Sequence, residues 1–166
     1  TLAVNGQEET KDFEILIDPR SESSLEGMQE QFDFIIEVRD ELTRVHKSIK
    51  EIRTIRKQIK GLNTKLQSDD KYKNEADLAD SIIASLTEIE ETLYQTKSRS
   101  GQDPLNYPIR LNNKLAHLNA LTGMGDFPPT DQAIALKNEL TELIEAQLSD
   151  FEALKAGDIA NLNNAI

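Results

Sequence analysis

The chain has 166 residues, a net charge of −11, 37% hydrophobic residues, 5% aromatic residues and no cysteine. This length suits one domain, and the low hydrophobic content is typical of a helical bundle in which each helix buries one face. The negative charge disfavours non-specific binding to nucleic acid or to an anionic membrane surface. The lack of cysteine excludes disulfides, thiolate metal sites and cysteine nucleophiles.

The N-terminal residues predict the last strand of a preceding β-domain. Apolar Phe13, Ile15 and Ile17 alternate with the residues between them, and Asp18-Pro19 ends the pattern. An isolated strand is not stable in water, so this strand is expected to belong to the sheet of the preceding domain, from which it is cut here. In the isolated chain we expect it to rest on the bundle or to pair with another copy of the chain. The chain begins without Met, which fits a piece of a longer protein.

This pattern divides the chain into two parts. Residues 1–20 are interpreted as the end of the preceding β-domain with a linker, and we expect residues 1–12 to be poorly ordered. Residues 21–166 are interpreted as a helical bundle domain.

The run Ser23–Leu66 predicts one long helix, with Ser23 and Glu26 at the spacing of a capping box. Gly61 is a point where the helix could end or bend. Its apolar residues recur at steps of three and four: Ile35, Val38, Leu42, Val45, Ile49, Ile52, Ile59 and Leu66. Arg56 and Asn63 occupy the two remaining positions of this seam. They either set the register of the bundle, as buried polar groups do in coiled coils, or mark where the bundle ends.

The charge of this helix changes sign along its length, from acidic to basic, which is the order that the helix dipole favours. We interpret the basic half, which begins at Arg44, as a solvated face beside acidic neighbours. A polyanion site is the alternative, but steps of three from Arg44 to Arg56 spread these side chains around the helix.

Three further helices are expected. The second, capped by Asn74, runs to about Thr96 with a seam of Ala79, Ile82, Leu86, Ile89 and Leu93, and folds back on the first as an antiparallel hairpin. The third has Leu111, Leu115, Leu118 and Leu121 inward. The fourth, capped by Thr130 and closed by Gly157, has the seam Ala133, Leu136, Leu140, Leu143, Gln147, Phe151 and Leu154. The expected fold is therefore mainly α, an up-and-down bundle of three to four helices preceded by a residual β-strand.

No residue pattern indicates catalysis, a cofactor or a metal. His46 and His117 have no companions at the spacing of a metal site or a triad. Carboxylates are numerous, but we expect them on exposed helix faces, whereas acid–base catalysis needs one that is desolvated in a cleft. The sequence therefore predicts no catalytic, cofactor-binding or metal-binding residue.

Loop aromatics are the one plausible platform for a ligand. Tyr107 and Phe127 lie among prolines and amides, and sugars stack on such rings; Asn112 is a further candidate contact. The alternative interpretation is that both rings plug the ends of the bundle.

Several segments together resemble a bacterial family. They are DPRS (Asp18 to Ser21), the helical run QEQFDFIIEVRDELTRVHKSIKEIRTIRKQI, YPIRLNNKLAHLN (Tyr107 to Asn119) and TDQAIALKNELTELIEAQL. The order of these segments resembles the C-terminal region of secreted BNR-repeat proteins with a sortilin-like β-propeller, often labelled glycosyl hydrolases. The resemblance covers the chain from about Phe13 onward.

The resemblance implies a propeller first, then a small β-domain, then this bundle, in a protein exported to the cell envelope or secreted. Catalytic residues of such a parent would lie in the propeller, so none is transferred to this chain. We therefore expect a non-catalytic accessory domain, with the upstream propeller as its partner. A homodimer and a glycan are further candidate partners, and a carbohydrate-binding module that assists a propeller glycoside hydrolase is the alternative function.

Overall fold

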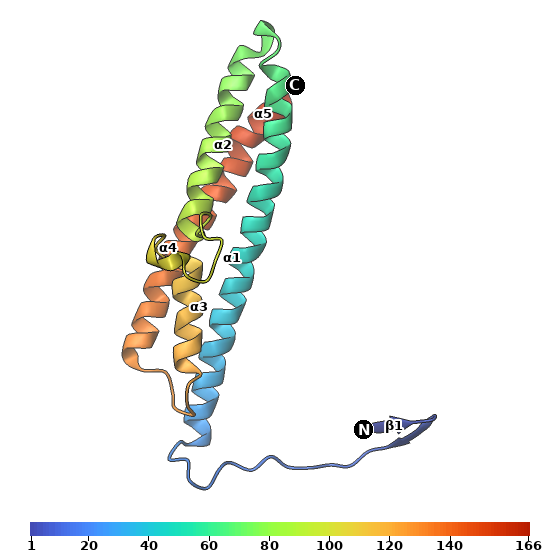
Figure 1. Cartoon of the computed structure of the whole chain (residues 1–166), viewed down its shortest axis with the longest axis vertical. Coiled ribbons are helices and arrows are strands. Elements are labelled where there is room, and N and C mark those ends of the chain that lie inside the picture. Colours follow the sequence, from blue (N-terminus) through green and yellow to red (C-terminus); the bar gives the residue numbers. More distant parts are fainter.

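The computed structural model describes residues 1–166 and shows a mainly helical chain in which four helices pack against each other (Figure 1). The elements are β1 Leu2–Val4, β2 Gln7–Glu9, α1 Leu25–Leu66, α2 Lys73–Leu93, α3 Leu111–Thr122, α4 Asp131–Leu154 and α5 Ala160–Ala165. The expected helical bundle with its long antiparallel hairpin is confirmed. None of the helices has an apolar stretch of the length that a membrane crossing requires.

The helices form three columns that lie side by side. The first is α1, whose 42 residues correspond to about 63 Å at 1.5 Å per residue. The second consists of α2 beside the C-terminal half of α1 and α3 beside its N-terminal half. The third consists of α4 and its extension α5, which run back along the other two (Figure 1). Only α1 is unbroken over the whole length of the bundle.

One apolar core runs through the three columns. It contains the expected seam of the second helix and most of that of the first, but Ile35 is only half-buried and lies outside it. The α1 positions that are fully buried include Val38, Val45, Ile49, Ile52, Ile59 and Leu66, and the whole α2 seam is buried. Phe34 of α1 also joins the core, although it lies beside the expected seam. The steps of three and four therefore identified the contact face of both helices.

The start of α1 lies one residue after the expected position. Ser24, not Ser23, is the N-cap, and its hydroxyl accepts a hydrogen bond from the amide of Gly27 at 3.0 Å. The helix passes through Gly61 without interruption. The second cap also differs, because α2 begins at Lys73 after a 3₁₀ turn and Asn74 lies inside the helix.

Two glycines of α1 provide a matched test of this packing. Gly61 has open space around it, whereas a Cβ on Gly27 would lie 3.1 Å from Cδ of Pro128. Because alanine has a higher helix propensity than glycine in a helix interior, we expect Gly61→Ala to raise the free energy of unfolding by about 1 kcal/mol. Gly27→Ala is expected to bring no gain, since its methyl group presses on Pro128. Urea denaturation followed by circular dichroism measures both, and equal gains would show that Gly27 and Pro128 are not in close contact.

The register expected for the fourth helix is partly wrong. Leu140 and Phe151 are buried, but the remaining core positions are Ile144 and Leu148, while Leu136 and Leu143 are 44% and 46% exposed. Leu121 of α3, also expected inward, is exposed as well. Gly157 does not close the helix, because a π-helical segment, Lys155–Ile159, carries the chain on into α5, where Leu162 is buried.

Ion pairs flank the contact between α1 and α4. Arg44 pairs with Glu41 on its own helix and with Glu145 of α4, and Lys137 of α4 pairs with Glu37. The hydrogen bond from Arg44 lowers the pKa of Glu145, and the two carboxylates raise the pKa of Arg44. These pairs accompany the inward face of α4, which the burial of Leu140, Ile144, Leu148 and Phe151 defines.

The N-terminal residues differ from the expected arrangement. Residues 13–17 form no strand; they are extended and unpaired. The strands are β1 and β2, an antiparallel hairpin within the region expected to be poorly ordered. Asn5 and Gly6 have φ of 51° and 81°, the conformation of a tight hairpin turn that Asn-Gly favours. Residues 10–24 join this hairpin to α1 away from the bundle (Figure 1).

Candidate functional site

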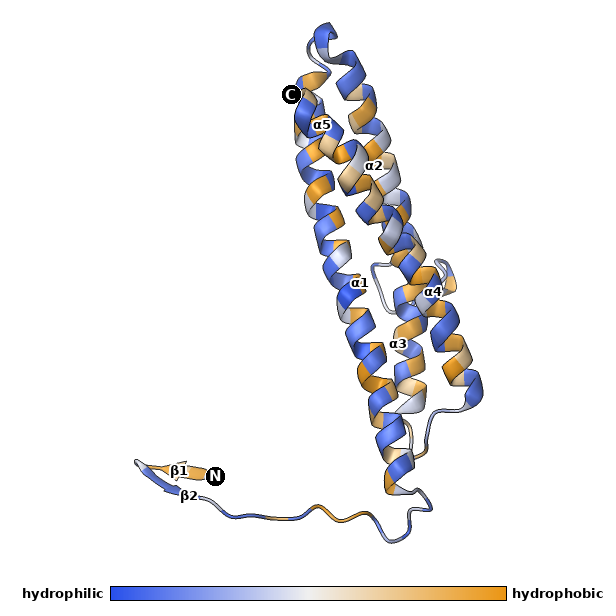
Figure 2. Ribbon diagram, turned by 180° about the vertical axis from the view of Figure 1, so that it is seen from behind, coloured by the Kyte–Doolittle hydropathy of each residue, from blue (hydrophilic) through white to orange (hydrophobic).

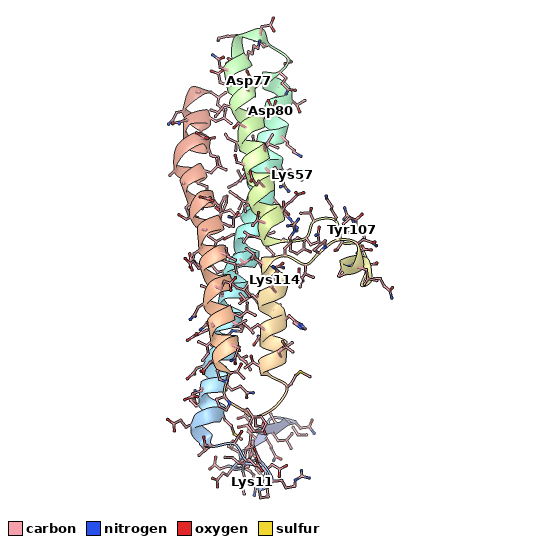
Figure 3. The ribbon with its side chains drawn as sticks, turned by 90° about the vertical axis from the view of Figure 1, so that its left-hand side faces the viewer. Lys11, Lys57, Asp77, Asp80, Tyr107 and Lys114 are labelled. Atoms are coloured by element: carbon pink, nitrogen blue, oxygen red, sulfur yellow. The ribbon has the colours of Figure 1, made fainter.

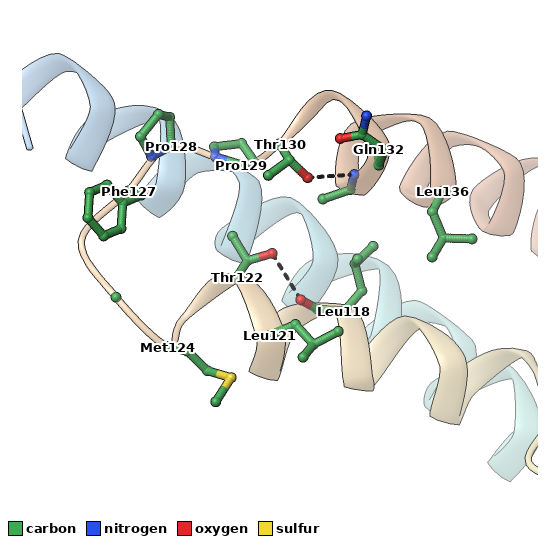
Figure 4. Close-up of a pocket in the computed structure, with 12 residues that line it drawn as sticks. Leu118, Leu121, Thr122, Met124, Phe127, Pro128, Pro129, Thr130, Gln132 and Leu136 are labelled. Atoms are coloured by element: carbon green, nitrogen blue, oxygen red, sulfur yellow. Dashed lines mark hydrogen bonds between the residues drawn. The ribbon is translucent and has the colours of Figure 1, made fainter.

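An open pocket of about 530 Å³ lies at the end of the bundle where α3 turns into α4. Exposed apolar side chains from both helices and from the connecting loop line it: Leu121, Met124, Phe127 and Leu136, above the buried Leu118 (Figure 4). Met124 is 82% exposed and Phe127 is 60% exposed. A concave apolar surface of this size is typical of a binding site.

The pocket has a defined shape because several bonds hold the loop. The side-chain amide of Gln31 in α1 donates hydrogen bonds to the carbonyl oxygens of Thr122 (2.7 Å) and Gly125. Thr130 caps α4 by accepting a hydrogen bond from the amide of Ala133 at 3.2 Å, as the sequence predicts (Figure 4). The N-terminal turn of α1 therefore supports one wall of the pocket.

The lining of this pocket is mostly apolar. It consists of Leu, Ala, Met, Phe, Pro, Gly, Thr and Gln residues, with no titratable side chain. Apolar contact with a partner is what the arrangement supports.

A second apolar surface lies in the extended N-terminal segment that precedes α1 in the chain. Phe13, Ile15 and Leu16 are 84%, 86% and 76% exposed, and Figure 2 shows this hydrophobic stretch away from the bundle. A β-turn follows, in which the amide of Ser21 donates to the carbonyl oxygen of Asp18 at 2.9 Å. The guanidinium of Arg20 also bonds the Asp18 carboxylate, which lowers the pKa of Asp18.

The two aromatic rings singled out in the sequence lie at opposite ends of α3. Tyr107 is in the loop before this helix, on a segment that stands away from the bundle (Figure 3), and Phe127 is in the loop after it. The 12 residues of α3 separate the two loops by about 18 Å. Tyr107 is 39% exposed, so neither ring is buried in an end of the bundle, and they share no platform.

Asn112, a candidate ligand contact from the sequence, is not on the surface. It is 4% exposed in the first turn of α3, and its Nδ2 lies 3.3 Å from Nε2 of His46 on α1. Its Oδ1 has no hydrogen-bond partner. This contact joins α3 to α1, so Asn112 is placed as a packing residue and cannot reach an external ligand together with Phe127.

The sequence analysis missed a buried carboxylate. Glu90 of α2 is 1% exposed, against the expectation that carboxylates lie on exposed faces. Its Oε1 accepts a hydrogen bond from Nε of Arg53 at 2.6 Å, and its Oε2 pairs with Arg56. The seam position of Arg56 was the signal that a buried acid would face it.

This cluster links α1 to α2. Arg56 also donates to the hydroxyl of Thr87 at 3.3 Å, and the Arg53 guanidinium lies 5.0 Å from the centre of the Tyr94 ring. A buried carboxylate between two guanidinium groups ties the two helices together, so we interpret the cluster as structural.

Asn63, the other polar residue in the α1 seam, is buried and contacts α2. Its Nδ2 donates to Oδ1 of Asp80 at 2.6 Å, and Gln67 donates to the other oxygen of Asp80 at 3.3 Å. Both polar seam positions therefore face polar partners on α2, Arg56 in the middle of the hairpin and Asn63 one turn before α1 ends. These partners favour the interpretation that polar seam residues set register, as they do in coiled coils.

The remaining titratable side chains do not converge on a site. No group of three His, Asp or Glu side chains is arranged to hold a metal ion, and His117 is exposed on α3. The candidate site is therefore the pocket between α3 and α4. Comparison with models of known protein families, with curated proteins and with solved structures finds no match for this chain.

Proposed function

We propose that this chain is a non-catalytic accessory domain that binds or braces a protein partner through the end of the bundle where its N-terminal segment enters. The single observation that carries this proposal is the uncovered apolar surface at that end. Met124 and Phe127 of the pocket and Phe13 and Ile15 of the segment are all well exposed. Surfaces of this kind mark interaction sites in soluble proteins.

The position of this surface favours a partner on the N-terminal side. The pocket lies against the first turn of α1, since Pro128 in its wall contacts Gly27. A domain that precedes residue 1 in a longer chain is therefore held near the pocket by covalent linkage, which raises its effective concentration.

The partner in this proposal is the upstream propeller of the exported BNR-repeat proteins that the sequence resembles. That part rests on the resemblance of the quoted segments alone, as does the location in the cell envelope or outside the cell. Self-association through the same apolar surface is the competing arrangement. The carbohydrate-binding alternative gains no shared ring platform from Tyr107 and Phe127, and glycan binding is an outcome of the test.

The test is a calorimetric titration of this chain with the separately expressed upstream propeller domain. We expect a micromolar or tighter complex and at least a tenfold weaker one for Phe127→Ser, because the exposed ring supplies contact area at the centre of the surface. Leu105→Ser is the matched control, since Leu105 is equally apolar and 85% exposed but lies in the loop before α3.

Three outcomes would overturn this proposal. The first is no detectable binding. The second is a dimer by light scattering that Phe127→Ser dissociates, which would assign the surface to a second copy. The third is glycan binding that Tyr107→Ser or Phe127→Ser abolishes.

A further inference from the structure

We infer that, in the absence of a partner, the segment Phe13–Ile17 folds back onto its own bundle and closes the pocket between α3 and α4, as a strap that hinges at residues 22 and 23. The partner of the proposed function would displace the strap, because it binds the same apolar surface.

The segment and the pocket match in chemistry. The pocket of about 530 Å³ is lined mostly by apolar atoms. In an extended chain, Phe13, Ile15 and Ile17 point to one side, while Asp12, Glu14 and Leu16 point to the other. The wholly apolar side can therefore enter the pocket while the carboxylates remain in water.

The segment can also reach the pocket. The pocket wall contacts the first turn of α1 through Pro128 and Gly27. Residues 18–24 would span up to about 23 Å if fully extended, at about 3.3 Å per residue. The turn at Asp18–Ser21, held by hydrogen bonds from Arg20 to Asp18, shortens this span but leaves the wall beside Gly27 within reach.

The hinge lies between the turn and the N-cap of α1. Only residues 22 and 23 separate the turn from Ser24, and no side chain of the bundle bonds to residues 18–22. Ser23 carries a buried hydroxyl without a partner in the open arrangement. Rotation at these residues moves the turn and the segment as one unit, and the effective concentration of a tethered segment favours its own pocket over that of a second copy.

The test uses a cysteine pair in the full chain, which has no native cysteine. Ile15→Cys is combined with Leu121→Cys in the pocket. The control combines Ile15→Cys with Gln29→Cys, which is exposed and lies about 200° around α1 from Gly27, within the same tether length. Mild oxidation is followed by non-reducing gel electrophoresis.

We expect the pocket pair to form an intramolecular disulfide at least tenfold faster than the control pair. Equal rates would overturn the inference, because they would show that the segment moves freely. A disulfide-linked dimer from the pocket pair would also overturn it, because the occupant would then be a second copy.

A second measurement does not depend on an engineered disulfide. The chain has two methionines, and the methyl group of Met124 lies in the pocket, so the methyl NMR signals of the protein labelled at methionine report on the strap. We expect Phe13→Ser to shift the Met124 signal, because the ring leaves the pocket, while Asp12→Ser leaves it unchanged. An unchanged Met124 signal in Phe13→Ser would contradict the closed arrangement.

Discussion

Replacing Arg56 by methionine is expected to lower the free energy of unfolding by about 2–3 kcal/mol, even though methionine is apolar like the other residues of the α1 seam. The reason is Glu90, which is 1% exposed and would keep only Arg53 as a partner. Breaking a buried ion pair from one side typically costs about 3–5 kcal/mol, because it leaves a charge that water cannot reach. The remaining hydrogen bond from Arg53 reduces this loss. Urea denaturation at neutral pH measures it.

The opposite substitution is expected to be milder. Glu90→Leu leaves two guanidinium groups, but the side chain of Arg53 is 47% exposed and that of Arg56 is 19% exposed, so both can reach water. We expect a loss of about 1 kcal/mol or less, and the double variant Arg56→Met with Glu90→Leu to be more stable than Arg56→Met alone. Arg39→Met, which removes an exposed pair with Asp40, is the control and should change little. If Glu90→Leu lowered the free energy of unfolding more than Arg56→Met does, the carboxylate of Glu90 would have to be hydrated.

Ile144→Ala in α4 is expected to lower the free energy of unfolding by about 2–4 kcal/mol. Ile144 is fully buried in the core that α4 shares with the other columns. Removal of its branched side chain loses buried apolar area and leaves a cavity that the packed helices cannot fill by relaxation. Thermal or urea denaturation monitored at 222 nm measures the change.

The neighbouring Leu143→Ala provides the control in the same helix. Leu143 is 46% exposed, so its truncation should cost well under 1 kcal/mol. The seam expected from the sequence places Leu143 inside and would reverse the order of the two losses. The pair of variants therefore determines the register of α4 in one experiment, and a larger loss for Leu143→Ala would mean that α4 is rotated from its position here.

The first two helices could be predicted well from the sequence because each packs against the other and the two are consecutive in the chain. The seams of α1 and α2 face each other across a short turn, so steps of three and four in one helix match those in the other. Helix α4 differs because two adjacent rows of its surface are apolar. Which row packs depends on the surface of the other helices, and the α1 partners of Glu145 and Lys137 on this contact lie about a hundred residues away along the chain. Periodicity in one helix carries no information on such partners.

The candidate site was less predictable than the fold. Phe127 was recognised as a loop aromatic, but its neighbours Leu121 and Leu136 were assigned to the core, so the pocket between α3 and α4 had no sequence signature. The hairpin at the N-terminus did have one, the Asn5-Gly6 turn, which outweighed the low hydrophobicity of its strands. Glu90 was hidden because one acidic residue beside an apolar seam resembles many solvated ones.

The break between α2 and α3 is a place where this fold can accept an insertion. The chain leaves the second column after Leu93 and returns to it at Leu111, and Gln95 holds the base of this excursion by donating to the carbonyl oxygen of Pro108 at 2.7 Å. Because both ends are fixed to one column, the segment near Gly101 can lengthen without changing how the helices pack. A foreign peptide inserted there would be displayed about midway along the bundle, whose first helix is about 63 Å long. It would lie on the side where this loop stands away from the helices (Figure 3).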